Sequence, residues 1–130
     1  MSVAASLKKA KEDLNLAYRY IISMFPEEVL KLYDKSVFVN TFEDYVEWRH
    51  NFIEAVLEIA EIIPDSDKNR YSSSPRAYCP LCGYGGTGGW NNSNGYAFPV
   101  GLDSHLRGHG NTQECYPMKI ACTIVKDKVK

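Results

Sequence analysis

Four residues in the C-terminal half of the chain have the types and the spacing of metal ligands. Cys79-Pro-Leu-Cys82 is a C-x-x-C pair, which places two sulfur atoms on one tight turn. His105-Leu-Arg-Gly-His109 places two imidazoles about one helical turn apart, and therefore on one face. These pairs use two of the chain's four cysteines and two of its three histidines, so coincidence is the weaker interpretation. The sequence predicts a structural zinc ion held by all four residues.

The fourth ligand has a competitor. Gly108 and Gly110 flank His109, and glycine is a frequent signal for the C-terminal end of a helix, so the helix can end before His109 is presented to the metal. Cys115 follows a few residues later and, as a thiolate, is an equally good ligand. The spacing favours His109 and leaves Cys115 as the alternative.

The segment around the histidines resembles a known family. Tyr96 is followed by Leu102, His105 and His109 at the spacing found in the second half of a two-cysteine/two-histidine zinc finger. In that family an aromatic residue and a leucine form the small core behind the metal. The resemblance covers residues 78–111 and implies a zinc-finger-like module. One departure is large, because residues 83–95 separate Cys82 from Tyr96, where the family has only a few residues.

The N-terminal half has the periodicity of amphipathic helices. Apolar residues recur at helical spacing over residues 3–24, and Pro26 ends that pattern and can begin a short helix to residue 33. A third helix is predicted from Thr41 to about Ile63, with Asn40 or Thr41 as its N-terminal cap and with Glu43 and Asp44 where a capping box places a carboxylate. Each helix has a broad apolar face, so we expect the three to pack as a bundle.

This reading divides the chain into three parts. Residues 1–64 are predicted to be the helical bundle, and residues 65–77 have the composition of a linker. Residues 78–130 are predicted to be the zinc-finger-like module with a C-terminal extension. Within that extension, residues 117–125 fit a strand and a helix equally well. The predicted fold class is mainly α.

Charge and hydropathy limit the partners and the cellular compartment that we expect for this chain. Residues 1–63 carry 7 Lys/Arg and 11 Asp/Glu, a net charge of −4, and residues 64–130 carry 8 and 5, a net charge of +3. That asymmetry falls well short of the dense basic face of a duplex-DNA binder. The sequence contains no apolar run of about 18 residues and no visible signal peptide. We therefore expect a cytoplasmic protein without a membrane partner.

The sequence does not match the catalytic motifs of metalloproteases or of zinc deaminases. The histidine spacing matches H-E-x-x-H metalloproteases, but Leu106 stands where their glutamate base would be. The H-x-E and P-C-x-x-C motifs of zinc deaminases are missing from the sequence. A zinc ion with four protein ligands would also have no open position for a substrate. The sequence predicts a protein that is not an enzyme.

The sequence bears on two kinds of partner, nucleic acid and protein. By analogy with zinc fingers, Phe98, Gly101 and Ser104 would face DNA bases, and none of them is a residue that grips a base edge in a bidentate manner. Non-specific or single-stranded nucleic-acid binding is the alternative that we keep. A protein partner is favoured, because the glycine-rich segment carries Tyr84 and Trp90, and large aromatic residues often anchor interfaces. In general character, the chain resembles small binding proteins of phages and other mobile elements, including inhibitors of host systems.

Overall fold

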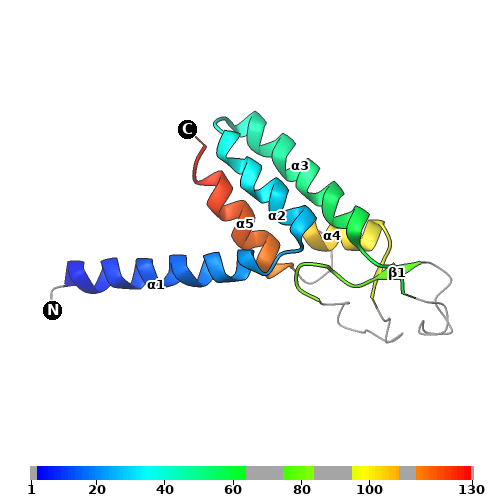
Figure 1. Ribbon diagram of the computed structural model, residues 1–130, viewed down its shortest axis with the longest axis horizontal. Coiled ribbons are helices and arrows are strands. Elements are labelled where there is room, and N and C mark those ends of the chain that lie inside the picture. The colour runs from blue at the N-terminus through cyan, green and yellow to red at the C-terminus, as the bar shows by residue number, and fades with distance from the viewer. Residues whose placement is uncertain (1–2, 64–74, 84–94, 109–113, 130) are drawn as a thin grey trace.

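The computed structural model describes residues 3–63, 75–83, 95–108 and 114–129. Across these ranges the chain is mainly α, as predicted, with five α-helices, one short 3-10 helix and a small two-stranded sheet (Figure 1). No helix in the described ranges is both long and apolar enough to cross a membrane. In chain order the elements are α1 (Val3–Ser23), α2 (Glu27–Asp34), η1 (Lys35–Phe38), α3 (Phe42–Ile59), β1 (Arg76–Ala77), β2 (Tyr96–Ala97), α4 (Val100–Arg107) and α5 (Tyr116–Lys126).

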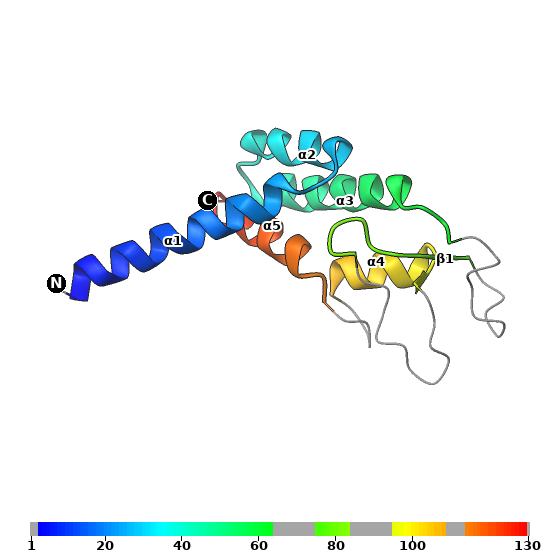
Figure 2. The same ribbon diagram turned by 60° about the horizontal axis from the view of Figure 1, so that its bottom comes forward.

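Helices α2 and α3 lie side by side, and α5 packs against α3 and against the C-terminal end of α1 (Figures 1 and 2). The N-terminal part of α1 extends away from the other helices in both views. Ile22 is the one buried residue of α1. The predicted packing of three helices therefore holds for α2 and α3, whereas α1 joins the body only near its C-terminal end.

The predicted capping box is present at the start of α3. The Thr41 hydroxyl accepts a hydrogen bond from the Asp44 backbone N–H at 3.1 Å, and the Asp44 carboxylate accepts one from the Thr41 N–H at 3.1 Å. Backbone N–H donors at Thr41 and Asn40 hold the pKa of Asp44 below its ordinary value, because they stabilise the carboxylate. These bonds satisfy donors that a helix start leaves without partners.

The end of α3 differs from the prediction. We expected this helix to continue to about Ile63, but it ends at Ile59. Ile62 instead forms an isolated bridge with Ala77, and the Ile63 N–H donates a hydrogen bond to the Arg76 carbonyl at 2.8 Å. Pairing with β1 has overridden the helical periodicity of these two isoleucines.

The core is built around aromatic residues of α3. Phe52 is fully buried, and the centroid of its ring lies 5.0 Å from that of Trp48 and 6.0 Å from that of Phe25. The Trp48 indole N–H donates to the Leu32 carbonyl at 2.9 Å, so the polar edge of this buried ring is satisfied. Phe52 and Trp48 thus join α2 and the connection between α1 and α2 to α3.

The ambiguous stretch 117–125 is helical and belongs to α5. Proline 117 stands in the first turn, where a missing N–H is tolerated. Met118, Ala121 and Val125 are buried at helical spacing. The same hydrophobic cluster contains residues of the N-terminal helices, of α4 and of α5. The predicted metal-binding half therefore shares one core with the helices before it.

Candidate metal centre

A short antiparallel ladder precedes the first two cysteines. β1 pairs with β2 in the register Arg76↔Ala97 and Ala77↔Tyr96. The last two residues of the predicted linker 65–77 thus form a strand. Gly95, just before β2, has φ +94°, and an added Cβ would lie 2.5 Å from Ile63 Cδ1. Only glycine fits at this close approach.

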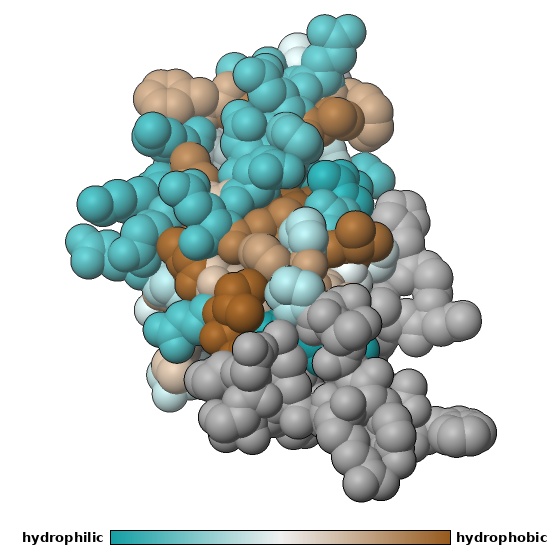
Figure 3. Space-filling model, turned by 90° about the vertical axis from the view of Figure 1, so that its right-hand side faces the viewer, coloured by the Kyte–Doolittle hydropathy of each residue, from teal (hydrophilic) through white to brown (hydrophobic). Residues whose placement is uncertain are grey.

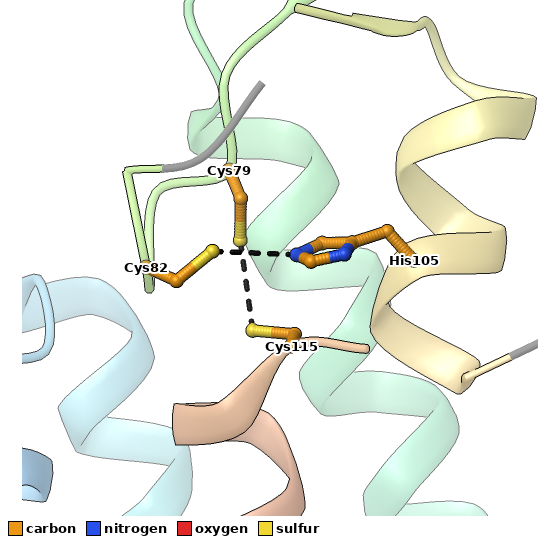
Figure 4. Close-up of side chains that lie close together, drawn as sticks. All are labelled: Cys79, Cys82, His105 and Cys115. Carbon is orange, nitrogen blue, oxygen red and sulfur yellow. Dashed lines mark hydrogen bonds between the residues drawn. The ribbon is translucent and has the colours of Figure 1, made fainter. Parts of the chain in front are cut away.

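Cys79 and Cys82 lie on the turn that follows β1. The Gly83 N–H closes the turn by donating to the Cys79 carbonyl at 2.8 Å. The turn brings both thiols to the same side, where they face α4 and the start of α5 (Figure 4). The C-x-x-C spacing therefore produces the paired presentation that metal sites use.

Helix α4 supplies His105. It ends at Arg107, and Gly108 adopts the left-handed conformation with φ +76°, which glycine tolerates without strain. The glycine signal noted in the sequence thus does end the helix before position 109. The predicted ligand His109 lies outside the described residues.

Tyr96 and Leu102 surround the His105 ring. Tyr96 stacks on the imidazole, with a centroid distance of 4.3 Å and an interplanar angle of 21°. Leu102, one turn before His105, is completely buried. This pair occupies the place that the zinc-finger resemblance assigns to the small core behind the metal. It fixes the ring orientation of His105.

Four candidate ligand atoms converge in this region (Figure 4). The sulfur atoms of Cys79, Cys82 and Cys115 and a ring nitrogen of His105 all lie within 4.8 Å of one another. Cys115 enters as the residue just before α5, at its N-terminal cap. Among the described residues, the structure brings together three of the four favoured ligands and adds the competitor Cys115 as the fourth.

The spacing of these atoms fits a tetrahedral metal ion. With metal–sulfur bonds of about 2.3 Å and metal–nitrogen bonds of about 2.0 Å, tetrahedral angles give edges of about 3.8 Å between sulfurs and about 3.5 Å between sulfur and nitrogen. The Cys79 and Cys115 sulfurs are 3.8 Å apart, and the Cys82 sulfur is 3.3 Å from His105 Nε2. The first distance matches and the second is slightly short. The cluster can hold a metal ion with small adjustments.

Burial makes the cluster unfavourable without a cation. Cys79, Cys115 and His105 are each 1% exposed, and Cys82 is half-buried. The pKa of the Cys115 thiol is raised, first by its hydrogen bonds with the Cys79 and Cys82 thiols, which stabilise the neutral form, and then by burial, which disfavours the thiolate. A bound cation would favour the thiolate over the neutral thiol, so metal binding would release the thiol protons.

The two residues predicted to contact a partner, Tyr84 and Trp90, lie outside the described residues. Comparison of the chain with known protein families, with curated proteins and with solved structures found no match. The conclusions below therefore depend on the geometry of the site and its surroundings.

Proposed function

We propose that this chain is a small, non-enzymatic zinc protein that acts by binding a protein partner. The observation that carries the zinc assignment is the compact set of three cysteines and one histidine. Thiolates with an imidazole in tetrahedral spacing suit zinc, whereas calcium, magnesium and manganese prefer oxygen ligands. The four ligands come from the turn, from α4 and from the start of α5, so the ion would join three segments that are far apart in sequence.

The absence of turnover is part of this proposal. Four side chains fill a tetrahedral shell and leave no position for a substrate or an activated water molecule. Leu106, which occupies the place of a metalloprotease glutamate, is 4% exposed and belongs to the hydrophobic core. Both features support a structural role for the ion.

A groove beside the metal centre offers a surface for the partner. It has a volume of about 630 Å³ and lies between α3 and the segment that leads into α4. Its apolar lining comes from Leu57 and from Phe98 to Val100, and Val100 is 73% exposed. Its acidic lining comes from Glu54, Glu58 and Asp103. This chemistry suits an apolar segment of another protein that is flanked by lysine or arginine.

The acidic lining of the same groove disfavours binding of duplex DNA. Phe98 and Ser104, two of the positions that would face bases in a zinc finger, line it together with Glu54 and Glu58. Carboxylates at that place would repel the phosphate backbone, which dominates affinity for nucleic acid. On the face drawn in Figure 3, brown hydrophobic side chains lie among teal hydrophilic ones, so this face offers both apolar and polar contacts. The aromatic segment with Tyr84 and Trp90 is the second predicted contact.

A matched pair of variants tests the groove. Glu54 and Glu58 are four residues apart on α3, and Glu43 and Glu47 repeat this spacing on the same helix but away from the groove. The substitutions Glu58→Lys and Glu47→Lys each convert a repulsive pair into an attractive one, worth about 0.2–0.5 kcal/mol to the helix. Neither variant should lose stability.

The experiment is affinity capture of tagged protein from its native cells after nuclease treatment, followed by titration of the purified partner. Glu58→Lys should weaken binding at least about tenfold, or about 1.4 kcal/mol, while Glu47→Lys binds like the parent chain. Equal affinities for the two variants would remove the groove from the proposal. Nanomolar binding to duplex DNA at physiological salt, with no protein recovered, would replace the protein partner by nucleic acid.

A further inference from the structure

The N-terminal arm of α1, residues 3–17, has no covering element among the described residues. All of its residues are exposed, including Val3 at 86%, Leu7 at 56% and Leu14 at 50%. The arm extends away from the body in both ribbon views (Figures 1 and 2). An isolated helix of this length is marginal in water, because most helical stability in proteins comes from packing an apolar face.

The arm carries a heptad pattern. Val3, Leu7, Ala10, Leu14 and Ala17 follow one another at alternating spacings of four and three residues. At 3.6 residues per turn these five side chains fall within a stripe about 80° wide. That is the spacing of the a/d seam of a coiled coil, here over two heptads, and such an exposed apolar stripe is stabilised when a second helix covers it. We call these five residues the seam.

The seam continues a contact that α1 already makes. Ile21 follows Ala17 on the same stripe, and Ile21 and the adjacent Tyr18 pack against the hydrophobic core. Helix α5 contacts α1 in the body. Ile22, the buried residue of α1, lies about 100° around the helix from Ile21. The seam therefore meets the docked face of α1 at Ile21, and it runs outward for two more heptads with no covering helix in the described part of the chain. Small alanines in the seam would let a second helix approach closely.

We infer that the arm is a dimerisation element, which forms a two-helix coiled coil with the arm of a second copy of this chain. A second copy brings the same heptad phase and the same length, so each seam residue finds a seam residue opposite it. The arm is about 22 Å long, which is short for a coiled coil. So short a seam makes a small interface, and we expect weak self-association, with a dissociation constant on the order of micromolar.

Two leucine substitutions on the same helix test this inference. Leu14 belongs to the seam, whereas Leu16 is 63% exposed and lies on the opposite side of the helix. Leu14→Glu and Leu16→Glu add the same charge two residues apart. Sedimentation equilibrium of the full chain over a wide micromolar range gives the dissociation constant, and zinc content and circular dichroism verify that the body of each variant is intact.

The parent chain and Leu16→Glu should show a monomer–dimer equilibrium with similar constants. Leu14→Glu should raise the dissociation constant at least about tenfold. The helical circular dichroism signal per residue at 222 nm should grow with protein concentration for the parent chain, because dimerisation stabilises the helix of the arm. For Leu14→Glu it should not change with concentration. A chain that stays monomeric over the whole range, or equal effects of the two substitutions, would overturn the inference.

Discussion

Replacing Cys115 by serine should weaken zinc binding by about 60–700-fold. Structural zinc sites have apparent binding free energies of about 10–16 kcal/mol. Divided over four ligands, each contributes about 2.5–4 kcal/mol, and each 1.4 kcal/mol is about a factor of ten. Cys115 is 1% exposed and its sulfur is 3.8 Å from that of Cys79, so no water molecule can easily replace the lost ligand.

The chain provides a matched control for this substitution. Cys122 lies on α5, is half-buried, and does not belong to the four-residue cluster. Cys122→Ser should therefore leave the affinity unchanged. The affinity of each variant is measured by competition with a chromophoric chelator. Cobalt substitution adds an independent readout, because the sulfur-to-cobalt charge-transfer absorption scales with the number of thiolate ligands.

The comparison with His109→Ala decides the fourth ligand. If Cys115 binds the metal, His109→Ala retains full affinity and the cobalt spectrum of the parent chain reports three thiolates. If Cys115→Ser binds zinc as tightly as the parent chain while His109→Ala loses it, the ligand set predicted from spacing alone would be right. The geometric reasoning given for Cys115 would then be refuted.

Four further predictions follow from the described contacts. Leu102→Ala should lower the free energy of unfolding by about 2–5 kcal/mol, because the side chain is fully buried behind His105, while Val100→Ala, at an exposed site, stays near the parent value in urea titrations. Thr41→Ala should cost about 0.5–2 kcal/mol through loss of the α3 cap, measured by thermal unfolding. The pKa of Asp44 is lower in the folded chain than its ordinary value of 3.8. The Asp44 carboxylate therefore contributes its full stabilisation of the fold above pH 3.8, and this stabilisation is lost as the pH falls through the folded pKa. Carboxyl NMR titration should place the midpoint of Asp44 below 3.8. Strong chelation should leave the helical signal of α2 and α3 largely intact while α4 loses its own, as followed by circular dichroism and amide exchange.

The sequence was a good guide wherever a local pattern decides the structure. The C-x-x-C turn, the glycine that ends α4 and the capping box at Thr41 each depend on residues within a few positions of one another. The pairing of Tyr96 with His105 could be anticipated because the family resemblance carries that spacing. These predictions needed no knowledge of how distant segments meet.

The sequence was a poor guide wherever tertiary contacts decide. A few residues separate Cys115 from His109, which makes Cys115 a candidate ligand, but only the packing of α5 against the other helices brings its sulfur to the cluster. Ile62 and Ile63 continue a helical stripe in sequence, yet they pair with β1. The exposure of the arm of α1 was also hidden, since an amphipathic helix has the same pattern whether its apolar face is covered by its own chain or by another.

The metal centre and the groove are mechanically linked, and the arm is separate from both. One wall of the groove is the start of α4, and α4 is held against α3 by Leu102, by Leu106 and, in the metal-bound chain, by ligation of His105. Removing zinc should therefore abolish partner binding by displacing that wall, whereas Glu58→Lys should weaken it at least about tenfold with the metal still bound. The arm projects from the other end of the body, so its self-association should survive chelation (Figures 1 and 2). Loss of dimers on chelation, or partner binding by the zinc-free chain, would show that this division of roles is wrong.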